Sequence, residues 1–207
     1  MRGTIRGFFV AVTAVFPVLV AGMIVPAQAA ITEHNSGAAA SAKISKSHPR
    51  PWVETIVALP YGARDWQYKQ VPWGADPHFY FPIINPHGWH DGRAAFGTTN
   101  GSCSWNNSTY VHTQWALNTD MLTRHWLRIP AHAFNVRISG TIDNDATVYF
   151  NGDELQSVTS GNCQSGAIDV TVPRRDLNRG YDLLAIRGHD YGVADFLDVT
   201  VTYEIAR

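Results

Sequence analysis

Apolar and polar residues alternate along several short stretches in the second half of the chain. In Asn135–Ile142, apolar or small residues at the even positions alternate with Asn, Arg, Ser and Thr, the period of a strand that buries one face. Thr147–Phe150 is rich in β-branched and aromatic residues, and Ile168–Val172 alternates again before Pro173 ends the run. Two more β-rich runs follow, Leu183–Arg187 and Phe196–Tyr203. The pattern predicts a series of short strands.

The connections between these runs are typical of an all-β protein. Asn151-Gly152 directly follows Thr147–Phe150, and this dipeptide accepts the two positive φ angles of a type I′ hairpin turn. Arg174–Asn178 could form a turn of helix, although a crossover loop before Gly180 fits the pattern better. Many short strands separated by Gly, Pro and Asn favour a sandwich or barrel.

The first half of the chain is less regular. Long segments rich in Pro, Gly, His and Trp separate its apolar runs, and all seven tryptophans lie between Trp52 and Trp126. The runs that we expect to form strands are Trp52–Leu59, Trp66–Val71, His78–Ile84, Tyr110–Trp115 and Met121–Ile129.

The N-terminus predicts export from the cytoplasm. Residues 1–29 combine early arginines, the apolar run Phe8–Val25 and the small-residue pattern Ala27-Gln28-Ala29, which together are typical of a signal peptide cleaved near Ala29. The alternative is that the apolar run stays as a membrane anchor. Residues 30–51 are small and polar and predict a flexible leader. The folded domain is then 52–207, with no membrane contact once the signal peptide is removed.

Charge and cysteine content narrow the possible partners. The whole chain has a net charge of −1, and the part after residue 29 is slightly more acidic because Arg2 and Arg6 are lost. No dense Lys/Arg cluster is present, so we expect no nucleic-acid partner. Cys103 and Cys163 have 59 residues between them, and a disulfide there would stabilise the fold by about 4 kcal/mol. An exported protein favours this bridge over two free thiols.

Three segments together resemble the galactose-binding-like jelly-roll domains. They are the strand ending in Trp126–Pro130, the hairpin Asp143–Gly152, and the element Asn178–Arg187, which is followed by a final strand. The resemblance departs at Arg179–Asp182, where the family usually has Pro-Gly-x-Asn. It implies an all-β jelly-roll sandwich like those of carbohydrate-binding modules and of accessory domains in β-galactosidase-type glycosidases. The matching segments are scaffold motifs, so they imply no sugar-contacting residue.

Three segments have the composition of a sugar-binding loop. Sugar recognition uses flat aromatic faces for the ring and polar groups for the hydroxyls, usually on loops. Such residues occur in Val71–His78, in Asn85–Arg93 and in His189–Gly192. For the two tryptophans, the alternative is that each folds back as a lid. The candidate carbohydrate-binding residues are Trp73, His78, Trp89, His90, Asp91, His189 and Tyr191.

Metal and catalytic motifs are weak. His78, His87, His90 and Asp91 lack the spacing of a zinc site, so no metal ligand is assigned. A structural calcium, which many sandwiches of the resembled family hold, is possible at Asp143, Asp145 and Asp153. No G-x-S-x-G elbow is present.

Three functions remain open after this reading of the sequence. The first is a secreted, non-catalytic carbohydrate-binding module whose partner is an extracellular glycan or a cell-surface component. The others are a structural or adhesion domain that binds a protein, and a glycoside-active hydrolase. The sequence favours the carbohydrate-binding module.

Overall fold

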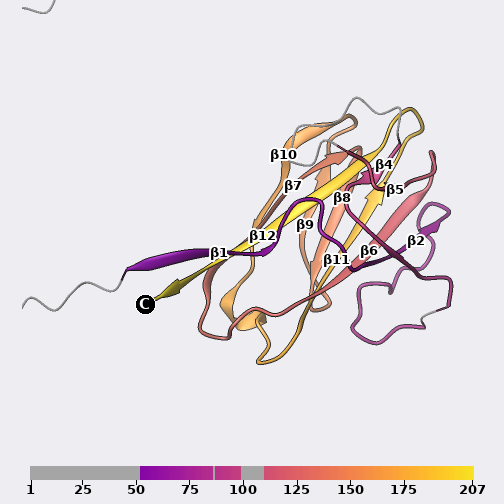
Figure 1. The fold of residues 1–207 in the computed structure, drawn as a ribbon. Helices are drawn as coiled ribbons and strands as arrows, with labels where there is room; N and C mark the ends of the chain where they lie inside the picture. Colours follow the sequence, from indigo (N-terminus) through magenta and orange to yellow (C-terminus); the bar gives the residue numbers. More distant parts are fainter. Residues whose placement is uncertain (1–51, 86, 99–109) are drawn as a thin grey trace, which may run out of the picture. The chain divides into compact units, whose positions relative to one another are not determined.

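The computed structural model describes residues 52–85, 87–98 and 110–207, which form two β-sheets (Figure 1). The predicted signal peptide 1–29, the leader 30–51 and Cys103 lie outside the described residues, so export, cleavage and the Cys103–Cys163 bridge stay predictions. The only helical segment among the described residues is a single 3-10 turn, Arg174–Asp176. The prediction of an all-β sandwich is confirmed.

The first sheet has the strand order β10-β7-β12-β4-β5, with β1 also paired to β12. Its pairs are antiparallel except for β4 and β5, which run parallel. The long central strands β7 and β12 share most of their length. The strands are β1 (Val53–Leu59), β4 (Phe96–Gly97), β5 (Thr113–Gln114), β7 (Phe134–Asp143), β10 (Gln164–Thr171) and β12 (Phe196–Ala206).

The second sheet has the order β3-β2-β6-β11-β8-β9 and is antiparallel throughout. At its centre, β11 pairs with β6 on one side and with β8 on the other. The strands are β2 (Trp66–Val71), β3 (His90–Gly92), β6 (Asp120–Leu127), β8 (Asp145–Phe150), β9 (Asp153–Thr159) and β11 (Asp182–His189).

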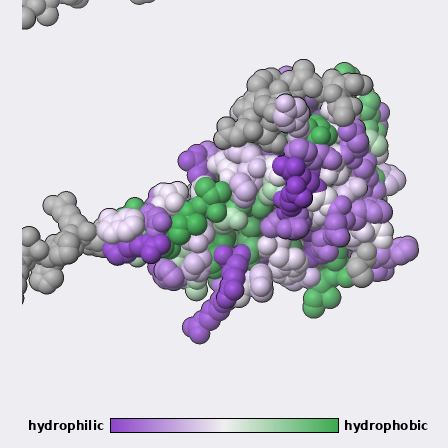
Figure 2. All heavy atoms as spheres, viewed as in Figure 1, coloured by the Kyte–Doolittle hydropathy of each residue, from purple (hydrophilic) through white to green (hydrophobic). Residues whose placement is uncertain are grey.

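The alternation seen in the sequence produces the core between the sheets. Ile138 and Ile142 of β7 are fully buried, as are Val148 of β8 and Ile186 of β11. Because successive side chains of a strand point to opposite faces, these residues face inward and their polar neighbours face outward. Hydrophilic residues cover much of the face drawn in Figure 2, and hydrophobic residues gather there in smaller groups.

The hairpin predicted at Asn151-Gly152 is present. Phe150 pairs with Asp153, so two residues connect β8 to β9. Asn151 has φ 52° and Gly152 has φ 101°, the two positive values that a type I′ turn needs. In addition, the Asn151 side chain donates to Asp182 Oδ1 at 2.8 Å and accepts from the Leu183 N–H at 2.7 Å. The turn is therefore tied to the start of β11.

Two predicted strands of the first half are wrong. His78–Ile84 forms turns instead, because the Phe79 and Phe81 N–H groups donate to carbonyls three residues earlier. Of Tyr110–Trp115, only β5 is a strand, since its partner β4 is equally short. Strands β3, β4 and β9 were not predicted.

The segment after β2 covers the outer face of the second sheet. We call residues 75–85 and 87–89 the cover loop; it lies at the lower right of Figure 1, beside β2 and β6. Its Phe79 is fully buried against Leu122 of β6 and Ala185 of β11, with Trp89 packed at the side. The apolar residues that suggested a strand thus pack onto the sheet one at a time. No helix in the described part of the chain has the length and apolarity to span a membrane.

Candidate functional site

A tight turn presents Trp73 at one end of the sandwich. The Ala75 N–H donates to the Pro72 carbonyl at 3.0 Å, which closes the turn directly after β2. Gly74, in the third position, has φ +71°, a conformation that favours glycine and that a type II turn needs there. Trp73 therefore projects outward, and 77% of it is exposed.

A buried carboxylate supports this turn. Asp120 begins β6 opposite Val71 and beside His189, the last residue of β11, and it is 0% exposed. Its Oδ2 accepts from the Gly74 N–H at 2.9 Å, and its Oδ1 lies 2.6 Å from His189 Nδ1. A buried carboxylate needs such partners to offset the loss of hydration. Asp120 thus joins the Trp73 turn to the end of β11.

Arg187 completes the support beneath the turn. Its Nη1 donates to Asp120, and its Nη2 donates to the carbonyls of Ala75 and Asp76, both at 3.1 Å. The guanidinium also lies 5.2 Å from the centre of the Phe79 ring. One arginine therefore fixes both the turn and the first residues of the cover loop.

Three aromatic rings form a row above this support, and we call Trp73, His189 and Tyr191 the aromatic row. The Trp73 and His189 rings stack with centroids 5.0 Å apart and 28° between planes. His189 and Tyr191 meet edge to face at 4.7 Å. The Tyr191 hydroxyl donates to Asp145, a hydrogen bond that raises the Tyr191 pKa. Tyr191 is 55% exposed, so the row is open to solvent at both ends.

Further buried carboxyls lie at the same end of the sandwich. Asp190 Oδ2 accepts from the Asn118 N–H at 2.6 Å, and Asp195 is fully buried. Burial raises the pKa of Asp195 to about 7, and the charges of Asp190 and Asp143 add to the effect. Asp195 is therefore protonated in the folded protein at mildly acidic pH.

The residues proposed for calcium do not meet. Asp145 begins β8, but Asp153 pairs with Phe150 at the opposite end of that strand. Six residues of strand span about 17 Å, so Asp153 cannot share an ion with Asp143 and Asp145, and this grouping is wrong. Within the described residues, no group of three or more His, Cys, Asp or Glu side chains is arranged to hold a metal ion.

Trp89 and His78 lie in the cover loop, away from the aromatic row. Trp89 is half-buried, and the buried Arg124 guanidinium lies 5.6 Å from its ring. Arg124 also donates to the carbonyls of Phe81 and Pro82, at 2.9 and 3.2 Å. His78 stacks on Phe81 at 5.5 Å. Trp89 and His78 line a separate cavity of about 380 Å³, so whether Trp89 binds a ligand or acts as a lid stays a prediction.

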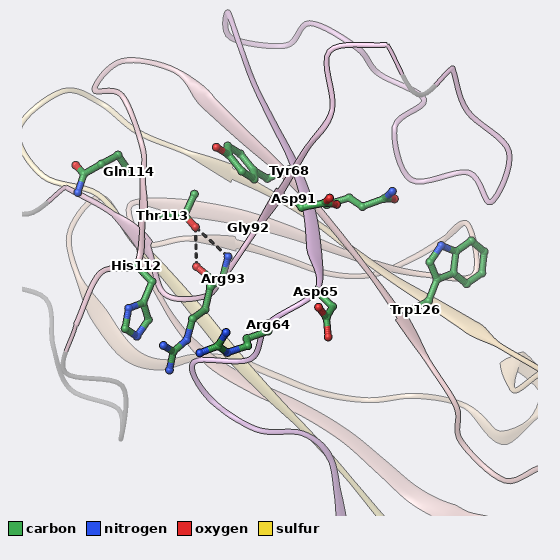
Figure 3. A pocket seen from close by; sticks show the side chains of 11 residues that line it. Arg64, Asp65, Tyr68, Asp91, Gly92, Arg93, His112, Thr113, Gln114 and Trp126 are labelled. Atoms are coloured by element: carbon green, nitrogen blue, oxygen red, sulfur yellow. Dashed lines mark hydrogen bonds between the residues drawn. The ribbon is translucent and has the colours of Figure 1, made fainter.

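His90 and Asp91 lie in a third place, on the edge strand β3. The His90 ring is 5.6 Å from that of Tyr68, and both residues of β3 are exposed. Asp91 lines a larger pocket of about 880 Å³ at the edge of the sandwich (Figure 3). The seven predicted residues thus fall into three separate groups, and the one with aromatic ring contacts among its members is Trp73, His189 and Tyr191.

Sequence reasoning missed the residues that hold the row. Asp120 directly precedes the apolar pair Met121-Leu122, and Arg187 directly follows the apolar run Leu183–Ile186; a charge beside such a run is a signal because charged residues are seldom buried without a partner. That signal would have identified both residues as candidates, but it would not have shown that they contact each other. The basic residues of the edge pocket, Arg64, Arg93 and His112, were also missed.

Comparison with known proteins finds only structural similarity. No protein-family model matches the sequence, and no curated protein does. A β-glucuronidase from Bacteroides uniformis aligns at 13% identity and a TM-score of 0.47, over 73% of this chain and 18% of that one. A β-glucuronidase from Ruminococcus gnavus, in complex with a C6-substituted uronic isofagomine, aligns at 11% and 0.47, over 73% and 29%.

A glycosyl hydrolase family 2 member from Bacteroides cellulosilyticus gives 13% identity and a TM-score of 0.43, over 68% of this chain and 20% of that one. The chain therefore spans less than a third of each of these enzymes.

Proposed function

We propose that the domain is a non-catalytic carbohydrate-binding module that holds a glycan on the aromatic row. The observation that supports this most directly is Trp73, which is 77% exposed yet fixed in place by buried partners. Exposing a large indole forgoes the stabilisation of its burial, about 1.5–3 kcal/mol for a large apolar side chain. A structural role for Trp73 gives no reason to build a buried charge network beneath it.

The geometry of the row suits a sugar ring. The indole of Trp73 offers a flat face for the C–H surface of the ring, and its stacking on His189 limits the rotamers that binding would have to freeze. A carboxylate only accepts hydrogen bonds, so His189 donates from Nδ1 to Asp120. Its Nε2 and the Tyr191 hydroxyl are then placed to meet sugar hydroxyls.

The burial of the nearby carboxyls supports binding over hydrolysis. A glycosidase needs two carboxyl groups that contact its substrate, about 5–9.5 Å apart. Asp120, Asp190 and Asp195 are each at most 1% exposed, so a glycan on the row cannot touch them. Asp145 is accessible, but it accepts hydrogen bonds from Tyr191 and from the Ser160 N–H.

The test is affinity electrophoresis of the mature protein through gels containing a panel of neutral and acidic polysaccharides. We expect at least one polysaccharide to retard the wild type, and Trp73→Ala to weaken that retardation by at least tenfold. Tyr181→Ala is the matched control, because Tyr181 is also an exposed loop aromatic (62%) but precedes β11 at its other end. No retardation of the wild type, or equal retardation of Trp73→Ala, would contradict the proposal.

The proposed setting is extracellular, with a glycan or cell-surface component as partner. This rests on the signal-peptide pattern of residues 1–29 and on the single cysteine pair. N-terminal sequencing of protein secreted by an expressing cell should begin close to Ala30. Intact mass with and without alkylation should show no free thiol before reduction; two alkylated thiols at that stage would exclude the bridge.

A further inference from the structure

The edge pocket is separate from the aromatic row. It lies where the β3 and β2 edge of the second sheet approaches β5 of the first, and its volume is about 880 Å³. Arg64 precedes β2, whereas Trp73 follows it. The six residues of β2 span about 17 Å, so one small ligand cannot occupy both places.

Two arginines and one histidine gather on one side of this pocket. Arg64, Arg93 and His112 lie together in Figure 3, on the side away from Trp126. Burial lowers the pKa of His112, and the charges of Arg93 and Arg64 lower it further. The other titratable groups that line the pocket are Asp65, Tyr68 and Asp91. The effect on His112 shows that both guanidinium charges act at the imidazole.

The Arg93 side chain is held in place beside Arg64 and His112 (Figure 3). Its backbone N–H donates to Thr113 Oγ1 at 3.0 Å, and that hydroxyl donates back to the Arg93 carbonyl at 2.8 Å (Figure 3). The Arg93 Nε donates to the Gly62 carbonyl at 3.0 Å. Gly62 is itself fixed, since its N–H donates to both carboxyl oxygens of Asp198, at 3.2 and 3.0 Å.

Neither arginine of this cluster has an ion-pair partner among the described residues. In the described part of the chain, neither Arg64 nor Arg93 forms a salt bridge, and no hydrogen bond uses the terminal nitrogens of Arg93. Asp65 and Asp91 line the same pocket without pairing to either arginine. Two guanidinium groups with open donors beside an imidazole repel one another, and a bound anion would relieve that repulsion.

The far side of the pocket can contact a sugar ring. Trp126 is 42% exposed and lies across the pocket from the cations (Figure 3), and Gln67 and Asp91 add groups for hydroxyls. The pocket is also too large for a single oxyanion. The residues that line it therefore suit a ligand with an anionic group attached to a polar ring.

We propose that the edge pocket is a second binding site, for an acidic polysaccharide whose carboxylate or sulfate group lies between Arg64, Arg93 and His112. The proposal rests on the proposed function in taking the ligand to be a glycan. It differs from that function in its residues and in its requirement for negative charge. Planar guanidinium donors suit both oxyanions.

The test is a proton NMR titration of the His112 ring in the mature protein with three oligosaccharides: an oligogalacturonate, a sulfated galactan oligomer and a neutral galactan oligomer. We expect at least one acidic oligomer to raise the pKa of His112 by about 0.5 or more, and the neutral oligomer to leave it unchanged. Which acidic oligomer binds identifies carboxylate or sulfate as the group recognised. No effect of either would overturn the proposal, as would an equal effect of the neutral oligomer.

Substitutions inside and outside the edge pocket test whether the acidic oligomer binds there. Arg93→Gln should weaken binding of the acidic oligomer about tenfold, the loss of one charge-assisted hydrogen bond, and Arg64→Gln should weaken it by a smaller factor. Arg128→Gln, an equal change of charge at an exposed position outside the pocket, should have no effect. Equal weakening by Arg128→Gln would mean a diffuse charge effect and overturn the site. Trp73→Ala should leave binding of the acidic oligomer intact. If Trp73→Ala abolishes that binding, the oligomer binds on the aromatic row and not in the edge pocket.

Discussion

The aromatic row and the cover loop come from chain segments of similar composition but have opposite environments. Trp73 is open to solvent above a buried charge network, whereas Trp89 is half-buried among apolar and aromatic side chains. A tryptophan among Pro, Gly and His is thus compatible with a surface platform or with a lid. The difference depends on what lies beneath each ring.

The second sheet provides both environments on one face. On β6, Asp120 is followed two residues later by Leu122, and on β11, Arg187 is preceded by Ala185. Because alternate residues share a face, the outer face of the second sheet changes from charged to apolar between residues two positions apart on each strand. The charged end holds the Trp73 turn by hydrogen bonds, whereas the cover loop is held by the packing of Phe79 together with hydrogen bonds from Arg124 to the Phe81 and Pro82 carbonyls.

The largest loss of stability should come from removing the buried carboxylate beneath the aromatic row. Asp120→Ala leaves Arg187 largely buried without its carboxylate and frees the His189 ring. We expect a loss of about 3–5 kcal/mol in the free energy of unfolding, measured by chemical denaturation. Asp153→Ala, at an exposed hairpin position, is the control. A loss below about 1 kcal/mol for Asp120→Ala would show that packing, and not the network, holds this end.

Removing the buried anchor of the cover loop should cost somewhat less. Phe79 is 0% exposed, and Phe→Ala substitutions in cores cost about 3–5 kcal/mol; we expect the lower limit because the loop can partly collapse. Trp73→Ala should change the unfolding free energy by less than about 0.5 kcal/mol. Similar losses for both variants would remove the distinction between platform and lid.

Trp89→Ala should lower stability without affecting glycan binding, the opposite of the effect expected for Trp73→Ala. Half-burial of its ring and its contact with Arg124 predict a loss of about 1–2 kcal/mol. Retardation by a polysaccharide should remain at the wild-type level, in contrast to Trp73→Ala. If Trp89→Ala abolishes retardation while still folded by circular dichroism, the cover loop belongs to the binding site.

The last prediction concerns the pH dependence of stability. The folded pKa of Asp195 is raised to about 7, above the unfolded value of about 3.9, so the folded state keeps a proton that the unfolded state loses between these values. The contribution of this group to stability therefore falls as pH rises from about 4 to 7.

Asp195→Asn removes that loss, so its melting temperature should exceed that of the wild type at pH 8. The difference should shrink at pH 4, where Asp195 is protonated in the folded wild type. A constant difference across this range would mean that ionisation of Asp195 is not its cause.

The sequence by itself determined the fold class and much of the second half of the chain. Alternation in Asn135–Ile142 and the turn residues Asn151-Gly152 act over a few neighbouring positions, so their meaning does not depend on distant contacts. The same reasoning failed for His78–Ile84 because its apolar side chains pack onto a face that other strands build.

The tertiary structure alone decided which candidate residues act together. Asp120 and Arg187 are 67 positions apart, and His189 is 69 from Asp120; they meet because β6 and β11 pair antiparallel with one particular register. Likewise Arg64, Arg93 and His112 share a pocket only because two sheet edges approach one another. Burial, charge pairing and pocket shape are properties of such long-range packing, which no local pattern in the sequence encodes.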